Sequence, residues 1–383
     1  MKSNRLTYLF MLLVIAACKQ SYEPPAIKAP NRFLVIEGVI NASAGAQTTI
    51  MLSRTRNLTD TFLTDPEKGA KVQIESSAGN VFTLTEQPAG TYTSVPLSLN
   101  VSQAYRLKIT TSDNKEYISD LVQVKPTPPI DSVTWRQAAV PGISKDVTIY
   151  ANTHDPSNNT RYYRWDYTEV WQFRAVHETD LGWNSAAGLI FYYPPSDQRY
   201  NCWITEPGNI IAVASSVKLS NDVIDHAPIT VIPQNSAKIG VRYSILVRQY
   251  ALTEAAYKYW EILQKNTQKL GTLFDAQPSQ LKGNFRSTSN ASEPVIGFAS
   301  VSTVEEKRLF ITRQEVNEWS GGVPQPDCPV ATTFQDPNNY LILNFPDTSF
   351  GPWYFVSGGI ILTKKVCLDC TRRGGSNQRP SFW

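Results

Sequence analysis

The sequence is poor in histidine and holds no familiar catalytic motif. Its 383 residues include three histidines, His154, His177 and His226, and none has a nucleophile close by in the sequence. The chain contains no G-x-S-x-G turn, no H-E-x-x-H, no phosphate-binding loop and no G-x-G-x-x-G. These absences exclude the serine hydrolases, zinc proteases and nucleotide-binding enzymes that such motifs mark. We therefore predict no catalytic residues, no cofactor and no metal site.

The sequence also lacks an excess of charge of either sign. It has 36 Lys and Arg against 33 Asp and Glu, and no basic block. Nucleic-acid-binding domains carry a basic stripe or patch that neutralises phosphates. A balanced chain without such a patch argues against a nucleic-acid partner.

Long apolar runs are missing as well. The apolar stretch from Leu6 to Ala17 is too short to cross a bilayer, which takes about 20 residues, and no later stretch comes near that length. With Lys2 and Arg5 before it, the stretch is typical of a secretory signal segment. We therefore expect export and no transmembrane helix.

The signal segment ends in the letters IAAC, with the cysteine at Cys18. An aliphatic residue and two small residues before a cysteine resemble the lipobox of bacterial lipoproteins. We predict a signal peptide over residues 1–17, lipidation at Cys18, and a proline-rich, semi-rigid tether over residues 18–32. The chain would then bind the membrane through its N-terminal lipid. The alternative is an ordinary signal peptide with a chance cysteine.

Four further cysteines remain for the folded part, Cys202, Cys328, Cys367 and Cys370. An exported protein occupies an oxidising compartment, which favours structural disulfides. Four cysteines allow three pairings, and the sequence does not choose among them. The C-x-x-C pair at 367–370 could instead be a redox or zinc motif. However, the following TRRGGSNQRP does not favour a helix start, and no histidine lies nearby.

What remains is rich in short β-type runs. Residues 33–125 alternate apolar and polar positions between turn signals, which predicts a small sandwich of the immunoglobulin or transthyretin type. The KPTPP stretch at 125–129 marks a domain boundary. Residues 130–383 predict a larger, β-sandwich-like domain that ends in a cysteine-containing tail.

One segment of the larger domain has a helical period instead. A prominent helix is expected near residues 254–270, with Thr253 as its N-cap and Gly271 after its end. The apolar face of this helix is expected to comprise Ala256, Trp260, Leu263 and Leu270.

The stretch TRYYRWDYTEVWQF, residues 160–173, predicts a strand with two different faces. One face would carry Tyr163, Trp165, Tyr167, Glu169, Trp171 and Phe173, and the other Arg164, Asp166, Thr168 and Gln172. Trp165, Tyr167 and Trp171 could form a stacking platform for a sugar or peptide ligand. Rings of this size more often fill the core of a sandwich, so we predict a core role for them. Glu169 on the same face would then pair with an arginine such as Arg248.

Oxygen-bearing side chains suggest two further sites. The loop at 154–159, HDPSNN, could bind calcium, but Asp-Pro followed by Asn-Asn is ordinary turn chemistry, so a turn is the better prediction. Paired carboxylates can hydrolyse glycosides without a sequence motif. Glu169, Glu178, Asp180 and Glu206 therefore keep a secreted hydrolase as a minor alternative.

A long central block resembles a known family. Residues 242–284, RYSILVRQYALTEAAYKYWEILQKNTQKLGTLFDAQPSQLKGN, look like the signature of a Bacteroidota lipoprotein family, the domain-of-unknown-function family numbered 4249. The lipobox, the FLVIEGVI opening, PPIDSVTW at the domain junction and the terminal C-x-x-C with its Gly-Gly and Pro-x-Phe-Trp match as well. The resemblance covers essentially the whole mature chain.

This resemblance implies a place and a partner, but no known activity. Such proteins are lipid-anchored in the cell outer membrane, typically beside a TonB-dependent receptor, and we favour the surface side over the periplasmic side. We therefore expect a non-enzymatic accessory protein that captures a ligand for such a receptor or lids it. The alternative is a stand-alone surface adhesion or glycan-binding lipoprotein.

Overall fold

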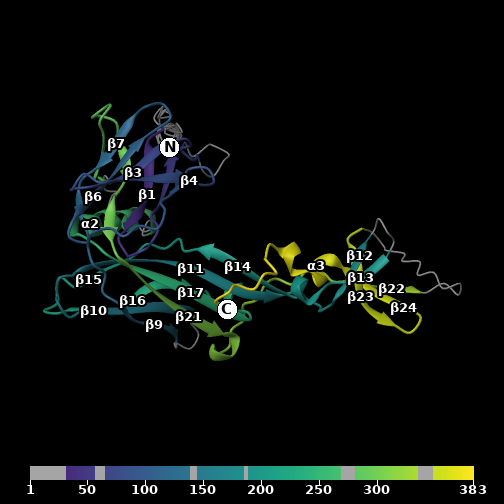
Figure 1. Ribbon diagram of the computed structural model, residues 1–383. Coiled ribbons are helices and arrows are strands. Elements are labelled where there is room, and N and C mark those ends of the chain that lie inside the picture. Colours follow the sequence, from purple (N-terminus) through teal and green to yellow (C-terminus); the bar gives the residue numbers. More distant parts are fainter. Residues whose placement is uncertain (1–31, 57–64, 139–144, 185–188, 269–280, 335–347) are drawn as a thin grey trace, which may run out of the picture.

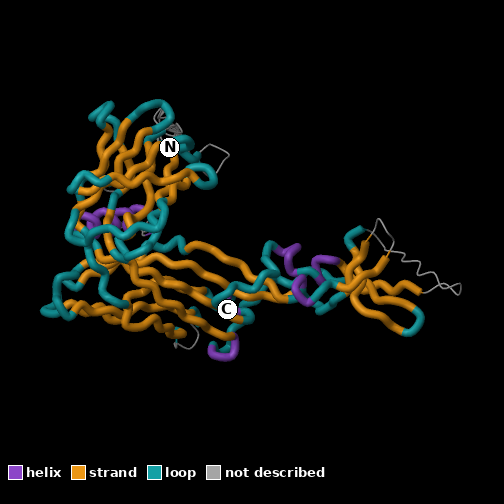
Figure 2. The backbone as a smooth tube through the Cα atoms, viewed as in Figure 1, coloured by secondary structure: helices purple, strands orange, loops and turns teal. Residues whose placement is uncertain are grey.

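A computed structural model describes residues 32–56, 65–138, 145–184, 189–268, 281–334 and 348–383 (Figure 1). The signal segment, Cys18 and nearly all of the tether lie outside the described residues. Strands dominate the fold and helices are few, as the sequence predicts (Figure 2). Within the described part of the chain, no helix combines the length and apolar character needed to cross a bilayer.

The N-terminal unit is a small β-sandwich. Its first eight strands are β1 (Leu34–Asn41), β2 (Thr49–Arg54), β3 (Lys71–Ser76), β4 (Val81–Glu86), β5 (Thr91–Thr93), β6 (Ala104–Thr110), β7 (Glu116–Ser119) and β8 (Val122–Gln123). Alternation builds its core, since Val72 and Ile74 of β3 are fully buried while Lys71 is exposed. The small sandwich predicted from the sequence is confirmed.

A later segment completes this unit, which corrects the predicted domain limits. The strands β18 (Phe285–Ser287), β19 (Val295–Gly297) and β20 (Ser300–Ser302) join the N-terminal sheet, with β19 and β20 pairing parallel to β1. Residues 130–383 are therefore not one separate domain. The proline-rich stretch at 125–129 marks where the chain leaves the first unit. It gives no indication that residues 285–302 pair with that unit again, because strand pairing joins residues far apart in the sequence.

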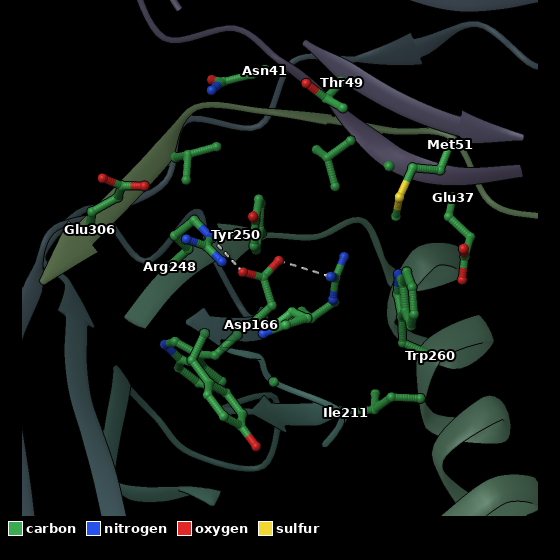
Figure 3. Close-up of a pocket in the computed structure, with 18 of the residues that line it drawn as sticks. Glu37, Asn41, Thr49, Met51, Asp166, Ile211, Arg248, Tyr250, Trp260 and Glu306 are labelled. Carbon is green, nitrogen blue, oxygen red and sulfur yellow. Dashed lines mark hydrogen bonds and ion pairs between the residues drawn. The ribbon is translucent and has the colours of Figure 1, made fainter. Parts of the chain in front are cut away.

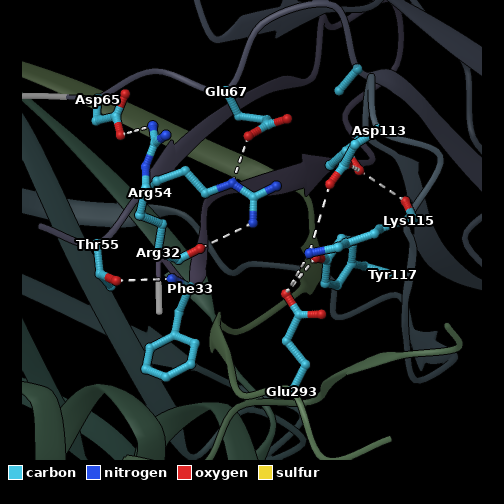
Figure 4. A network of polar contacts seen from close by, with 12 residues as sticks. Arg32, Phe33, Arg54, Thr55, Asp65, Glu67, Asp113, Lys115, Tyr117 and Glu293 are labelled. Carbon is cyan, nitrogen blue, oxygen red and sulfur yellow. Dashed lines mark hydrogen bonds and ion pairs between the residues drawn. The ribbon is translucent and has the colours of Figure 1, made fainter. Parts of the chain in front are cut away.

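Polar contacts hold the returning segment in place (Figure 4). The Tyr117 hydroxyl donates a hydrogen bond of 2.8 Å to Glu293, and Lys115 lies 3.8 Å from the same carboxylate. Burial, and then the Glu293 carboxylate, raise the pKa of Tyr117 to about 12. Arg54 pairs with Glu67 at 2.6 Å on the same side of the sandwich. These groups satisfy one another and thereby fasten the segment to β7.

The second unit, the body, stacks two sheets face to face (Figure 1). One contains β9 (Ile130–Gln137), β10 (Val147–Asp155) and β16 (Asp222–Ile232). The other contains β11 (Tyr162–Arg174), β14 (Asn201–Pro207), β15 (Ala212–Ser215), β17 (Arg242–Ala251) and β21 (Val304–Thr312). Ile149 and Ile229 from the first sheet and Tyr243 and Val247 from the second pack in one core cluster.

The predicted helix is α2 (Glu254–Gln268), at the junction of the two units (Figure 2). The Thr253 hydroxyl accepts the backbone N–H of Ala256 at 3.2 Å, so its capping role is confirmed. The buried face is Ala256 and Tyr259, with Trp260 partly buried and Leu270 outside the described residues. Tyr259, which the predicted face did not include, is buried because it packs against Phe298 of the returning segment, whereas Leu263 is only partly buried.

A third, smaller unit projects from the body as an arm (Figure 1). It contains β12 (Leu181–Asn184), β13 (Leu189–Tyr192), β22 (Val330–Phe334), β23 (Phe350–Val356), β24 (Gly359–Lys364) and α3 (Lys365–Leu368). The remaining helical turns are η1 (Pro195–Asp197), η2 (Ala237–Ile239), η3 (Arg313–Glu315) and η4 (Cys370–Arg373). The region predicted as a cysteine-containing C-terminal tail therefore includes a separate small sheet, formed by β22, β23 and β24.

Two disulfides fasten the arm and the tail. Cys202 of β14 bonds to Cys370, and Cys328 bonds to Cys367. The two cysteines of the C-x-x-C pair therefore have different, distant partners. The structural interpretation of the four cysteines is confirmed, and the pairing that the sequence left open is now given.

Candidate functional site

The aromatic face of β11 is core, so a stacking platform there is ruled out. Trp165 is 1% exposed, Tyr167 2% and Trp171 6%. The Trp165 indole donates to Gln249 at 2.8 Å, and the Tyr167 hydroxyl donates to Thr230 at 3.0 Å. The proposed ligand-binding role of Trp165, Tyr167 and Trp171 is therefore wrong. Rings on this face fill the space between the two sheets of the body.

The buried Glu169 on the same face has a different partner from the one expected. It pairs with Lys238 of η2 and accepts a hydrogen bond of 2.7 Å from the Tyr243 hydroxyl. Arg248 lies on the opposite face, because strand register places it beside Asp166. Glu206 also approaches Lys238, at 4.0 Å.

The remaining sequence candidates do not converge on a catalytic centre. Glu178 and Asp180 are exposed on the connection from β11 to β12, away from the Glu169–Glu206 pair. Because Lys238 and Tyr243 bind the Glu169 carboxylate, it is not available as a nucleophile or general base. Within the described residues, no three His, Cys, Asp or Glu side chains cluster as metal ligands would.

The three histidines lie apart from one another and contact different groups. His154 pairs with Asp131 at 2.8 Å, His177 stacks on Trp353 with ring centroids 3.8 Å apart, and His226 pairs with Asp225 at 2.5 Å. None of these contacts joins a histidine to a serine, threonine or cysteine side chain.

The loop at 154–159 is a turn, as predicted. The Asp155 carboxylate accepts backbone N–H bonds from Ser157, Asn159 and Thr160 at 2.8 to 3.0 Å. Burial alone would raise the pKa of Asp155, but these hydrogen bonds and the Ser157 hydroxyl outweigh it and lower the pKa to about 2. The carboxylate oxygens therefore organise the turn itself.

A cleft between the N-terminal unit and the body is the main candidate site (Figure 3). Its volume is about 1020 Å³, at the upper end for ligand pockets. The outward residues of β1 and β2 form one wall, and β11, β17 and β21 form the opposite wall. Trp260 of α2 and the loop at 207–211 close one side.

The wall from the N-terminal unit is polar with apolar spots. Alternate residues of β1 and β2 face the cleft because successive side chains of a strand point to opposite sides. These residues are Glu37, Val39 and Asn41 of β1 and Thr49 and Met51 of β2, and Gln47 lines the cleft from just before β2. The amide and hydroxyl groups among them can both donate and accept hydrogen bonds.

The wall from the body carries a row of alternating charges. Asp166, Arg248 and Glu306 lie side by side on three neighbouring strands, because register pairs Asp166 with Arg248 and Arg248 with Glu306. Arg248 donates to Asp166 at 2.6 Å and to Thr168 at 2.8 Å. Burial acts to lower the pKa of Arg248, but Asp166 raises it above its ordinary value.

Arg164 adds a second cation that aromatic rings hold in place. Its guanidinium lies 4.1 Å from the Trp260 ring centroid and 5.0 Å from that of Tyr250. It also donates to Asp166 at 3.1 Å. Burial, and then Asp166, raise the pKa of Tyr250, so its phenol stays protonated. Stacking and ion pairing together fix this guanidinium before any ligand arrives.

The sequence predicts the strand face that forms part of this cleft but does not predict the cleft. Arg164, Asp166 and Thr168 were assigned to the second face of the strand, and their alternation with buried rings was the available signal. Glu37 and Thr49 come from another unit, and no local pattern links them to β11. The described lining residues include the carboxylates of Glu37, Asp166 and Glu306 and the guanidiniums of Arg164 and Arg248, but no histidine and no cysteine.

Comparisons with known proteins give a family and little else. The model of the family described as "Domain of unknown function (DUF4249)" matches residues 19–308. No curated protein matches the chain. One solved structure, the adhesin InvE of Yersinia pseudotuberculosis, is similar at 13% identity and a TM-score of 0.16, over 58% of this chain and 57% of that one. The chain thus spans little more than half of that adhesin, and at this TM-score the likeness carries no argument.

Proposed function

The chain belongs to the DUF4249 family, and we propose that it is a lipid-anchored, non-catalytic protein of the outer membrane that captures a ligand in its interdomain cleft. In this proposal it works as the accessory of a TonB-dependent receptor, on the cell-surface side. The lipobox-like segment at Cys18 and the resemblance stated above support the anchor and the partner.

The cleft is the observation that carries the capture role. Two independently packed units contribute its walls, and ion pairs and ring stacking hold its charged side chains in place. Preorganised groups lose little freedom on binding, which favours affinity. The lining offers many hydrogen-bonding side chains, and the Asp166 carboxylate is bonded to both Arg164 and Arg248, which favours holding a ligand over acting on it.

Purification from native outer membranes tests the partner. The tagged protein would be extracted in a mild detergent, and its companions would be identified by mass spectrometry. We expect a TonB-dependent receptor in stoichiometric amount. The Cys18→Ser variant, which removes the proposed lipid site, is the control, and it should leave the membrane fraction. If the wild-type protein emerges alone, the stand-alone adhesion or glycan-binding alternative replaces the receptor role.

A further inference from the structure

We propose that the ligand of this cleft is a neutral oligosaccharide, held by an interleaved set of charged and uncharged polar side chains. The inference rests on the capture role proposed above and names its ligand class. It is carried by the arrangement of charges, the composition of the walls and the pairing of the strands that line the cleft.

The charges of the cleft alternate in sign and nearly cancel. Two arginines, Arg164 and Arg248, face three carboxylates, Asp166, Glu37 and Glu306. Asp166 is bonded to both arginines, and register places Glu306 beside Arg248, so each arginine has a carboxylate next to it. An anionic ligand would meet a carboxylate beside each arginine, and a cationic ligand would meet an arginine beside Asp166. An uncharged ligand avoids both repulsions.

Donors and acceptors therefore lie next to each other across the floor. Arg248 uses its Nε and Nη2 groups for Asp166 and Thr168, and a guanidinium has five N–H donors, so further donors remain. Glu306 lies directly across from Arg248 and supplies acceptors. A sugar hydroxyl both donates and accepts, so neighbouring hydroxyls can satisfy both kinds of group at once.

The rest of the lining suits the same ligand. Uncharged polar groups come from Asn41, Ser43, Gln47, Thr49 and Asn209. Met51 and Ile210 are 49% and 40% exposed and supply apolar surface for the C–H faces of sugar rings. The volume of about 1020 Å³ is large for a single small molecule, which favours several linked sugar units.

A peptide fits this cleft less well. Peptides commonly bind by adding a strand to an open sheet edge. In this cleft β1 is already paired with β2 on one side and with β19 and β20 on the other. β17 lies between β11 and β21, so its backbone groups are occupied too. Of the strands that form the two walls of the cleft, β21 alone stands at the end of its sheet, so recognition falls mainly to side chains, as it does for hydroxyl-rich sugars.

Calorimetric titration of the purified chain tests the ligand class. The probes are neutral hexasaccharides of glucose, mannose, xylose and galactose, a galacturonic acid hexamer, and mixed-charge hexapeptides. We expect at least one neutral sugar to bind with an affinity that changes little between low and high salt, because no net charge is neutralised. Binding of the peptides or the acidic sugar alone, or of no probe, would overturn the inference.

Two variants locate the binding in the cleft. Asp166→Asn keeps the side-chain shape but leaves both arginines without their counter-ion. We expect neutral-sugar affinity to fall about tenfold, which is about 1.4 kcal/mol, and salt-sensitive binding of the galacturonic acid hexamer to appear. Because Asp166→Asn could impair folding, Glu306→Gln serves as the second variant, with a smaller loss expected. Asp225→Asn, a carboxylate on β16 outside the cleft, is the matched control and should bind as the wild type does.

This outcome is separable from that of the capture role. If a receptor co-purifies but no neutral sugar binds, the ligand class is wrong and the accessory role stands. If a neutral sugar binds but no receptor co-purifies, the ligand class stands and the receptor partnership fails. Affinity that is unchanged in both Asp166→Asn and Glu306→Gln would place any observed sugar elsewhere on the molecule.

Discussion

The two faces of strand β11 are surrounded in opposite ways. On the inner face, Tyr163, Trp165 and Tyr167 are at most 2% exposed and pack against the second sheet of the body. On the outer face, the side chains of Arg164 and Asp166 are 14% and 30% exposed and line the cleft. The same alternation of residues thus separates packing from binding. Stability should depend on the first face, and ligand affinity on the second.

Substitutions at two neighbouring residues, Trp165 and Arg164, should give the largest difference in the free energy of unfolding. Trp165→Ala removes a fully buried ring and its bond to Gln249, and should lower the free energy of unfolding by about 3–5 kcal/mol. Arg164→Gln, one residue away on the outer face, should cost about 1 kcal/mol, since it removes a partly exposed ion pair and ring contacts. Urea unfolding followed by fluorescence measures both. Equal losses would mean that the two faces do not differ in the way proposed.

The next largest loss of stability is expected from removing the Cys202–Cys370 disulfide. Cys202 lies opposite Phe173 on β11, and its bond to Cys370 ties the C-terminal segment to this end of the sheet. Removing it as the Cys202→Ala/Cys370→Ala pair should cost about 2–4 kcal/mol.

The second disulfide is the control for the first. Cys328→Ala/Cys367→Ala opens a shorter loop, with a sequence separation of 39 against 168, and should cost less in the same assay. A larger loss for the shorter loop would show that the arm, and not the body, limits the stability of the chain.

Local periodicity explains what the sequence could predict. The two faces of β11, the helix at 254–268 and the turn around Asp155 all follow from residues close together in the chain, and the structure confirms each. The mostly β fold follows in the same way from the many short alternating runs.

Long-range register explains what the sequence could not predict. Val304 donates its backbone N–H to the Ser43 hydroxyl at 2.9 Å across 261 residues, and no local pattern encodes that meeting. The return of residues 285–302 to the first sheet, the disulfide partners and the cleft walls are all of this kind. The Glu169 error has the same origin, since its partner Lys238 lies on η2 and not on a neighbouring strand.

Glu169 departs from the contrast between the two faces of β11, because it places a charged side chain on the inner, aromatic face. The carboxylate side chain is 5% exposed, and Lys238, at 26%, is its counter-ion. Lys238→Met should cost about 2–3 kcal/mol, below the range for fully buried pairs because Lys238 partly reaches solvent. The double variant Lys238→Met/Glu169→Gln should recover much of this loss, since no uncompensated charge remains. If the double variant is no more stable than the single one, the cost lies in lost packing of Lys238 against Trp171.

The smallest expected effect belongs to a residue on neither face, the turn residue Asp155, and it depends on pH. Its folded-state pKa is about 2, below the ordinary value of 3.8, so its ionised form stabilises the fold. That contribution is complete above about pH 4 and is lost as pH falls from there through about 2. After allowance for solvent screening it should be about 1 kcal/mol. Asp155→Asn keeps part of the turn but cannot ionise, so the stability difference between it and the wild type should shrink from about 1 kcal/mol at pH 6 towards zero near pH 2. A difference that stays constant across this range would mean that the backbone N–H groups of the turn do not depend on the charge of Asp155.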